Sequence, residues 1–250
     1  MRGSCQCGAV VYEVAAPLRP VILCHCTQCR KWSGHVWAAS SVSEAAFTLI
    51  RAGALRWFRS SDTAERGFCG DCGSCLFWHP FGEGTMHFAP GTLDGPTGLA
   101  VAEEWFEADA GDYYTTPERA DALTGSCLCG ANRFRVTGAM GEVTACHCSQ
   151  CRKSSGHFAS SFDVDEGAVI WSDKLVSEYE GPGGSQRGFC QRCGSHLYFR
   201  GRDGGFSVEA GSIENPTGGR LVAHIHVADK GDYYAVTDGA PLIATEGTNA

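Results

Sequence analysis

The stretch Cys24-His25-Cys26-Thr27-Gln28-Cys29-Arg30-Lys31 decides the organisation of the chain, because it occurs twice. It returns as Cys146-His147-Cys148-Ser149-Gln150-Cys151-Arg152-Lys153, 122 positions further on (146 − 24). A Cys-x-Cys motif precedes each copy of the stretch, and a Cys-x-x-Cys motif follows it. These motifs are Cys5-x-Cys7 and Cys69-x-x-Cys72 in the first copy, and Cys127-x-Cys129 and Cys190-x-x-Cys193 in the second. The 250 residues therefore form a tandem duplication of one cysteine-rich unit.

The duplication predicts two domains, residues 1–117 and 122–250, instead of one large domain. Each half is long enough to bury a hydrophobic core of its own. The polar stretch 115–124 is interpreted as the linker between them. Residues 235–250 have no counterpart in the first copy, and we expect them to form a loose tail.

Short runs of β-branched and aromatic residues, separated by glycine turns, predict a mainly β unit. In the first copy a strand follows Gly8, and the other strand candidates are residues 36–42, 47–50, 55–59, 75–78, 85–93 and 101–106. Arg30-Lys31-Trp32-Ser33-Gly34 predicts a short helical turn that ends at its glycine. No long helical periodicity occurs in the sequence, which favours a small β domain in each copy.

Composition restricts the class of partner. The chain is 43% hydrophobic and 19% charged, with a net charge of −8. This acidic balance disfavours a nucleic-acid or anionic-membrane surface, which needs clustered Lys and Arg. No apolar run approaches the length of a membrane span. Because Met1-Arg2-Gly3-Ser4 leads directly into the first cysteine motif, we expect no signal peptide and a cytoplasmic protein.

The fifteen cysteines are either disulfides or metal ligands. Their odd number and their Cys-x-Cys and Cys-x-x-Cys spacings favour metal binding. If Cys5 and Cys7 lie on a strand, their side chains point to the same face and can hold one ion together. A Cys-x-x-Cys turn does the same, and Gly73 and Gly194 permit the bend.

Four such thiolates form a closed tetrahedral zinc site of the structural kind. One predicted site consists of Cys5, Cys7, Cys69 and Cys72, and the other of Cys127, Cys129, Cys190 and Cys193.

Three cysteines of each copy remain, and three protein ligands with one open position are typical of a catalytic zinc. They are Cys24, Cys26 and Cys29 in the first copy, and Cys146, Cys148 and Cys151 in the second. Three thiolates make the ion a weaker Lewis acid than three neutral histidines would, so activation of water is disfavoured. A soft thiol suits the open position better and would be held there as the nucleophilic thiolate. The sequence thus predicts about four zinc ions per chain.

The motifs Ser-Cys-x-Cys-Gly-Ala-x-x-Tyr, Cys-His-Cys-x-x-Cys-Arg-Lys and Phe-Cys-x-x-Cys-Gly-Ser, in this order, resemble the glutathione-dependent formaldehyde-activating enzyme family. That family is also known as the centromere protein V-like domain and has the Mss4-like β fold. The resemblance covers both copies and implies two tandem Mss4-like β domains. It also implies a structural zinc at the flanking motifs and an exchangeable zinc at the central motif.

The resemblance implies a carbon–sulfur lyase of the S-(hydroxymethyl)glutathione synthase type. Such an enzyme would add a zinc-bound thiol, glutathione or a similar small thiol, reversibly to formaldehyde or another small aldehyde. The family's His-Ile-aromatic motif occurs as His224-Ile225-His226 in the second copy, where the first copy has Glu104-Trp105-Phe106. We therefore expect the second copy to respond to thiols at least as well as the first.

The alternative is a non-catalytic zinc module, with both metal sites structural and a surface that binds a protein. Coordination by Cys75 or His196, which occupy matching positions, would favour this alternative. We expect both to be ordinary strand residues, because each flanking site already has four cysteines. Arg30-Lys31 and Arg152-Lys153 either hold the carboxylates of an anionic substrate or are solvated turn residues that offset the charge of the zinc–thiolate cluster.

Four histidines recur in matching positions. His25 and His147 lie between two ligands, and we expect them to face away from the metal and to be hydrogen-bonded. For His35 and His157 a structural role is favoured over proton transfer beside the open zinc. The pairs Tyr113-Tyr114 and Tyr233-Tyr234 are interpreted as packing residues.

Overall fold

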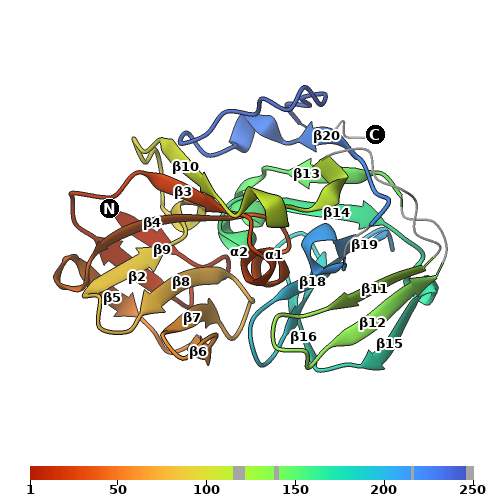
Figure 1. The fold of residues 1–250 in the computed structure, drawn as a ribbon, viewed down its shortest axis with the longest axis horizontal. Coiled ribbons are helices and arrows are strands. Elements are labelled where there is room, and N and C mark those ends of the chain that lie inside the picture. The colour runs from red at the N-terminus through yellow and green to blue at the C-terminus, as the bar shows by residue number, and fades with distance from the viewer. Residues whose placement is uncertain (115–121, 138–140, 215–216, 246–250) are drawn as a thin grey trace.

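The computed structural model describes residues 1–114, 122–137, 141–214 and 217–245 and contains the same β architecture twice (Figure 1). Each copy has one three-stranded and one seven-stranded sheet. The expected mainly β fold with two tandem domains is confirmed.

In the first copy the strand orders are β1-β2-β5 and β10-β3-β4-β9-β8-β7-β6. The strands are β1 Arg2–Ser4, β2 Val11–Val14, β3 Val21–Cys24, β4 Trp37–Ser43, β5 Phe47–Arg51, β6 Leu55–Arg59, β7 Ala64–Cys69, β8 Cys75–Pro80, β9 Thr85–Phe88 and β10 Val101–Trp105. The strand expected over 85–93 ends at Phe88, because a 3-10 turn, η2 (Pro90–Thr92), begins with proline.

In the second copy the orders are β11-β12-β15 and β16-β17-β18-β19-β14-β13-β20. The strands are β11 Ala122–Ser126, β12 Arg133–Thr137, β13 Val143–Cys146, β14 Ala159–Asp163, β15 Val169–Asp173, β16 Val176–Glu180, β17 Gln186–Cys190, β18 His196–Arg200, β19 Phe206–Glu209 and β20 Leu221–Ile225. In both copies the strand that carries the first central cysteine pairs in parallel with the last strand of the copy, as β3 with β10 and β13 with β20.

Two short helices follow the central cysteines, α1 (Thr27–Ser33) and α2 (Ser149–Ser155). Figure 1 places both at the centre of the molecule. Helix α1 begins three residues before the expected turn, because Cys26 accepts a hydrogen bond from the Cys29 backbone and caps its start. It ends at Gly34, which takes the left-handed conformation with φ of 85°. Within the described ranges, no helix is long and apolar enough to cross a membrane.

The two copies pack on each other through these helices. Helix α1 lies against η6 (Ala210–Ser212) of the second copy, and α2 lies against η2 of the first. The Gly211 backbone N–H donates to Gly34 O at 2.7 Å, and the Gly91 N–H donates to Gly156 O at 3.1 Å. A Cβ atom at position 91 would lie 2.6 Å from Gly156 O, so the close approach requires glycine there.

The hydrophobic interior is shared between the copies. Trp32 is fully buried, and its indole N–H donates to the carbonyl of Cys193 at 3.0 Å. Val36 and Tyr113 of the first copy belong to the core cluster of the second. The expectation that each half buries a core of its own is therefore incomplete, since part of each core is supplied by the other copy.

Two expectations about loops are wrong. The linker expected over 115–124 is too long, because strand β11 begins at Ala122; residues 115–121 lie outside the described part of the chain. The tail is not loose over 235–245. Its Pro241 carbonyl accepts from the His224 backbone and Ile243 N–H donates back to His224 O, both at 2.8 Å. Residues 246–250 are not described.

Candidate metal centres

The four flanking cysteines of the first copy form one cluster. Their Sγ atoms lie within 4.8 Å of one another. Cys5 and Cys7 lie in the turn after β1 and not on a strand as expected, yet their sulfurs are 3.5 Å apart. Cys69 ends β7, Cys72 lies in the turn that leads to β8, and Cys7 Sγ is 3.8 Å from Cys69 Sγ. The turn therefore brings together the four cysteines that the motifs group, although Cys5 and Cys7 do not lie on a strand.

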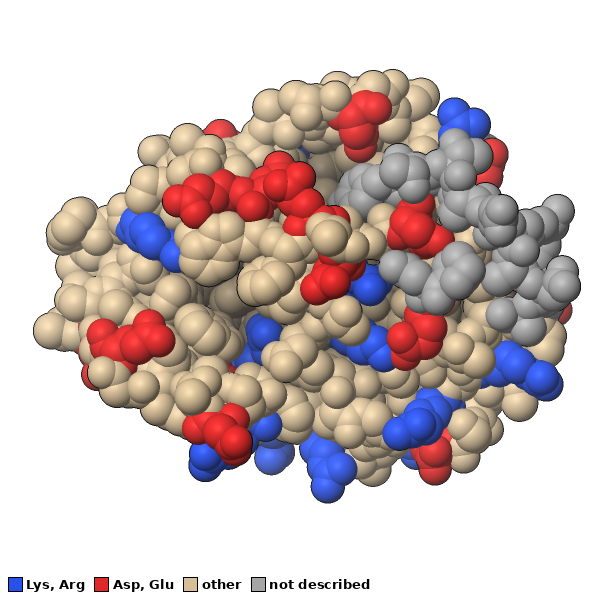
Figure 2. Space-filling model, viewed as in Figure 1, with Lys and Arg blue, Asp and Glu red and all other residues tan. Residues whose placement is uncertain are grey.

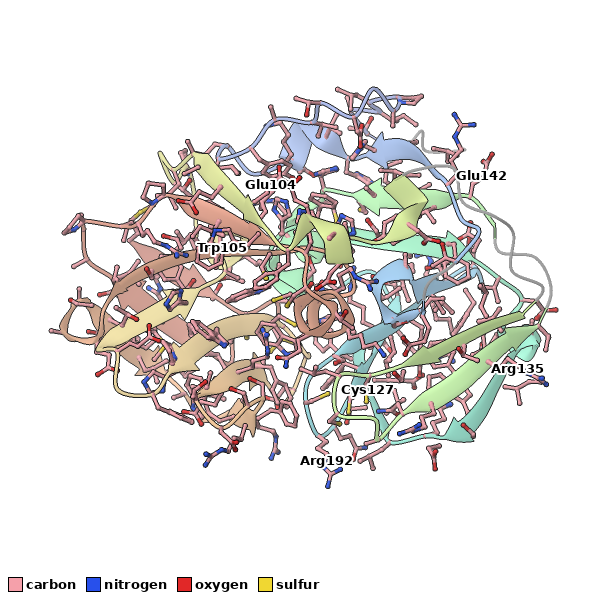
Figure 3. All side chains as sticks on the ribbon, viewed as in Figure 1. Glu104, Trp105, Cys127, Arg135, Glu142 and Arg192 are labelled. Carbon is pink, nitrogen blue, oxygen red and sulfur yellow. The ribbon has the colours of Figure 1, made fainter. Side chains whose placement is uncertain are left out.

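These distances fit zinc. A tetrahedral ion with metal–sulfur bonds of ~2.3 Å has sulfur–sulfur edges of about 3.8 Å. In the second copy Cys127 and Cys129 are 3.6 Å apart, and Cys129 and Cys190 are 3.7 Å apart. Figure 3 shows Cys127 beside other sulfur atoms. Cys190 and Cys193 are fully buried, which agrees with a closed, structural site.

The three central cysteines of each copy form a second kind of cluster, again with all Sγ atoms within 4.8 Å of one another. Cys24 ends β3, Cys26 precedes α1, and Cys29 lies in the first turn of the helix. Hydrogen bonds from Cys24 and Cys29 hold the pKa of Cys26 well below its usual range. The same arrangement recurs in the second copy, where hydrogen bonds from Cys146 and Cys151 lower the pKa of Cys148. Each cluster thus favours a thiolate, the form that binds metal.

One arginine contacts each three-cysteine cluster and was not anticipated. Arg66 Nη2 lies 3.6 Å from Cys29 Sγ, and Arg187 Nη2 lies 3.9 Å from Cys151 Sγ. Both side chains are buried, with relative exposures of 4% and 6%. A guanidinium there offsets the negative charge of clustered thiolates. The available signal was the repetition of Arg-Gly-Phe-Cys in both copies, with arginine at a fixed distance before the late cysteine pair.

Cys75 and His196 take no part in any of the four clusters. Both side chains are buried between the copies: Cys75 Sγ lies 3.4 Å from Trp32 O, and His196 Nε2 lies 3.0 Å from Gly73 O. Burial raises the pKa of Cys75 well above its usual value and lowers that of His196 to about 4. Their positions agree with the expected role as ordinary strand residues.

The histidines of the central motifs face away from the sulfurs, as expected, and are hydrogen-bonded. His25 pairs with Glu104 on β10 at 2.9 Å. His147 pairs with His224 on β20 at 2.8 Å, and His224 in turn with Asp238 at 2.8 Å. The parallel strand pairing that places Glu104 beside the first motif places His224 beside the second.

A cavity of about 370 Å³ lies between the copies at these histidines. Its wall includes His25 and Glu104 from the first copy and His224 and Asp238 from the second. Figure 3 labels Glu104 on β10, and Figure 2 shows acidic side chains gathered over this strand and the turn after it. The first copy therefore has a carboxylate where the second has an imidazole, which makes its side of the cavity less favourable to anions.

His35 and His157 are structural. Both are buried, and each is hydrogen-bonded to a buried tyrosine, His35 to Tyr113 at 2.5 Å and His157 to Tyr233 at 2.8 Å. Burial holds the pKa of both imidazoles well below the usual value. The expected structural role of the histidines and the packing role of these two tyrosines agree with this geometry.

The basic residues after each third cysteine bridge the copies. Lys31 Nζ donates to Ser126 and pairs with Glu214, both in the second copy. Lys153 Nζ pairs with Asp94 of the first copy at 2.7 Å. Both lysines therefore join the two halves. The two arginines differ from them, because their guanidiniums contain buried nitrogen atoms without a hydrogen-bond partner among the described residues: Arg30 Nε, Arg30 Nη1 and Arg152 Nε.

Comparison with known proteins assigns the chain to a family. The sequence profile of the glutathione-dependent formaldehyde-activating enzyme family matches residues 1–109 and 122–229. The chain therefore belongs to this family, which it represents twice in tandem.

Two proteins that are similar in sequence to this chain have names that refer to a lyase or to this family. An uncharacterized lyase of Schizosaccharomyces pombe is 28% identical over 115 residues, covering 44% of this chain and 82% of that protein. A putative glutathione-dependent formaldehyde-activating enzyme of Halomonas elongata is 36% identical over 87 residues, covering 30% of this chain and 54% of that protein. A crystal structure of a Rhodobacter sphaeroides protein matches 42% of this chain and 99% of its own, with 24% identity and a TM-score of 0.35. The family and these names support a general lyase-type function.

Proposed function

We propose that the protein is a zinc-dependent carbon–sulfur lyase that adds a small thiol, glutathione or a similar compound, reversibly to formaldehyde or another small aldehyde. The observation that carries this proposal is the three-cysteine cluster. Among the described residues, no fourth Cys, His, Asp or Glu belongs to either of these clusters, whereas both flanking clusters have four ligands. A metal held by three thiolates has a position left for an incoming ligand.

A zinc ion bound there supplies a soft Lewis acid that keeps an incoming thiol deprotonated at neutral pH. In the reaction the thiolate sulfur attacks the carbonyl carbon, a carbon–sulfur bond forms, and the carbonyl oxygen takes up one proton. The thiol has released one proton, so the addition is balanced, and the reverse reaction restores thiol and aldehyde.

The residues of this chain hold and orient the cluster. The Cys29 and Cys151 backbone N–H groups donate to the preceding cysteine sulfurs at 3.5 Å and 3.4 Å, which fixes the turn. Arg66 and Arg187 place positive charge beside the third sulfur of each cluster. This charge reduces the repulsion between the thiolates and an approaching anionic thiol.

Cobalt substitution tests the proposal. Cobalt–thiolate charge-transfer bands should strengthen when glutathione is added, as sulfur enters the open position. The response should survive Cys75→Ala and vanish in the double variant Cys24→Ala with Cys146→Ala. No change with any thiol at millimolar concentration would refute the enzyme, and the non-catalytic zinc module would replace it.

The proposal includes four zinc ions per chain and two domains, residues 1–117 and 122–250. All fifteen cysteines are free of disulfides in the structure. Free thiols are typical of proteins from a reducing compartment. This supports the cytoplasm as the proposed location.

A further inference from the structure

The cavity of about 370 Å³ between the copies is separate from the metal centres. Among the described residues that line it there is no cysteine. Leu23 and His25 line it, whereas Cys24 and Cys26, which alternate with them along the chain, belong to the first three-cysteine cluster. Alternate residues of an extended segment point to opposite sides, so the cavity and the cluster lie on opposite sides of this motif. Its volume is within the range of pockets that hold small molecules.

The wall of this cavity is acidic. Glu104 and Glu107 come from the first copy and Asp238 from the second, and no lysine or arginine is among the described residues of the wall. Lys230 lies over the ring of Tyr234, but its Nζ donates to two backbone carbonyls and it does not line the cavity. Three carboxylates around a partly enclosed space favour a cation.

A chain of hydrogen bonds in the wall also leaves an acceptor for a ligand. Burial alone would raise the pKa of Asp238, but the hydrogen bond from His224 outweighs it and lowers the pKa below its usual value. The carboxylate is therefore ionised and accepts from His224 Nε2 at 2.8 Å. Neutral His224 then accepts on Nδ1 from His147 Nε2, and neutral His147 accepts on Nδ1 from the Tyr234 hydroxyl. The Tyr234 oxygen, whose proton is used in this chain, is left to accept from a further donor.

His157 is a second polar group that points to a ligand. It lines the cavity and is only 1% exposed. Its Nδ1 lies 2.8 Å from Tyr233 Oη, and its Nε2 has no hydrogen-bond partner among the described residues. Burial holds the pKa of this imidazole well below its usual value, so it is neutral. With the proton on Nδ1 and donated to Tyr233, Nε2 accepts from a ligand. A polar atom without a partner on a buried side chain is costly, and a donor from a ligand would satisfy it.

The remaining wall is apolar and aromatic. The rings of Phe158 and Tyr234 have centroids 5.9 Å apart, and both residues line the cavity together with Leu23, Val36 and Val101. A hydrocarbon group that enters this space removes apolar surface from water, and the faces of aromatic rings attract an ammonium group.

We propose that the cavity between the copies binds a small primary amine in its ammonium form, with an apolar body, and that it is a second ligand site of this chain. The N–H groups of the ammonium donate to Tyr234 Oη, His157 Nε2 and the carboxylates of the wall, and the apolar body packs against Phe158. The site requires both copies, because Glu104 and Glu107 are in the first and the other groups are in the second. It does not depend on the proposed addition of a thiol to an aldehyde.

The test is isothermal titration calorimetry of the full, metal-replete chain at neutral pH with three probes of similar size. 2-Phenylethylamine carries an ammonium group, 2-phenylethanol carries a hydroxyl, and 3-phenylpropionate carries a carboxylate. We expect the amine to bind about tenfold more tightly than the alcohol, which is about the contribution of one charge-assisted hydrogen bond. We expect no measurable binding of the carboxylate probe at millimolar concentration.

Variants locate the site. The double variant Glu104→Gln with Glu107→Gln should bind the amine about fivefold more weakly and leave the affinity for the alcohol unchanged, since two exposed charges are removed. Glu103→Gln is the matched control, because Glu103 is an exposed glutamate of the same strand that does not line the cavity, and it should keep the native affinity. Tyr234→Phe keeps the ring and removes the acceptor oxygen, and it should weaken amine binding about fivefold.

Two further variants separate the cavity from the metals. Ala235→Trp changes an exposed residue of the wall and should abolish binding of both the amine and the alcohol, because the indole fills the cavity. The double variant Cys24→Ala with Cys146→Ala, checked for its β circular dichroism, should bind the amine with the native affinity.

Loss of amine binding in the folded double cysteine variant would show that the amine coordinates a metal and would overturn the site. Equal affinities for the three probes, or no heat with the amine at millimolar concentration, would overturn the ligand class. Native affinity for the amine in both Ala235→Trp and the double glutamine variant would overturn the location. Each of these results leaves the proposed thiol chemistry standing, because cobalt spectra test that chemistry separately.

Discussion

Replacing Glu209 by glutamine should make the stability of the protein less dependent on pH. Glu209 ends β19 and lies against Gly34 at the end of α1, with a relative exposure of 6%. Its Oε2 has no hydrogen-bond partner among the described residues. Burial raises the pKa of this carboxyl from 4.5 to about 8, although Arg187 opposes the shift.

The direction of this pH dependence follows from the number of protons that the folded and unfolded chains bind. Between pH 4.5 and about 8 the folded chain holds a proton on Glu209 that the unfolded chain has released, so stability falls as pH rises through this window. One pH unit corresponds to about 1.4 kcal/mol, which gives a cost of about 2.7 kcal/mol at pH 6.5 and about 5 kcal/mol above pH 8. Between pH 6.5 and 9 the native chain should therefore lose about 2 kcal/mol more than Glu209→Gln.

Urea unfolding of metal-replete protein at pH 6.5 and 9, followed by circular dichroism, measures this difference. Glu83→Gln, at an exposed glutamate, is the control and should follow the native chain at both values. If the free energies of unfolding of the native chain and Glu209→Gln change in parallel between the two pH values, then Glu209 is ionised in the folded protein and the reasoning is refuted.

Other outcomes follow from the metal sites and the shared core. Elemental analysis of reduced, metal-replete protein should find about four zinc ions per chain, and two or fewer would contradict two sites in each copy. Cys72→Ser should unfold or precipitate the first copy, because a structural zinc contributes to folding, whereas Cys29→Ser should lose one metal and keep its β circular dichroism; equal collapse would make both sites structural. Trp32→Ala should lower the free energy of unfolding by about 3–5 kcal/mol, and Ser154→Ala, at the matching position, by about 1 kcal/mol; equal losses would disprove a special role for the indole between the copies.

The cysteine clusters were predictable because the spacing within each motif acts over a short stretch of chain. Cys26 and Cys29 are three residues apart, and one turn of helix brings their sulfurs together whatever surrounds them. The placement of Cys5 and Cys7 on a strand was wrong, but their sulfurs still meet, since a turn joins residues two apart as well as a strand does. For this reason the predicted grouping of Cys5 with Cys7 was correct even though the predicted secondary structure was wrong.

The contacts between the copies could not be predicted from either repeat alone. Lys31 and Lys153 occupy the same place in their motifs, and only the docking of the halves shows that each pairs with an acid of the other copy. The tail was misjudged for a related reason: it lacks a repeat partner, yet the β20 backbone that includes His224 provides hydrogen bonds for it. Comparing the two copies of the sequence shows which residues they share, but it does not show which residues make contacts between them.

Duplication within one chain permits the surroundings of the two clusters to diverge, and Gln6 and Leu128 are matching residues that differ and that reach the opposite copy. In an assembly of identical copies, a change from glutamine to leucine at the position of Gln6 would alter both clusters at once. Here Gln6 contacts Gln150 of the second central motif, and Leu128 lies beside Gln28 of the first. Glu104 and His224 differ in the same way at the cavity between the copies. A fused pair can therefore keep the cysteine clusters of both copies unchanged while each copy places a different residue beside the cluster of the other.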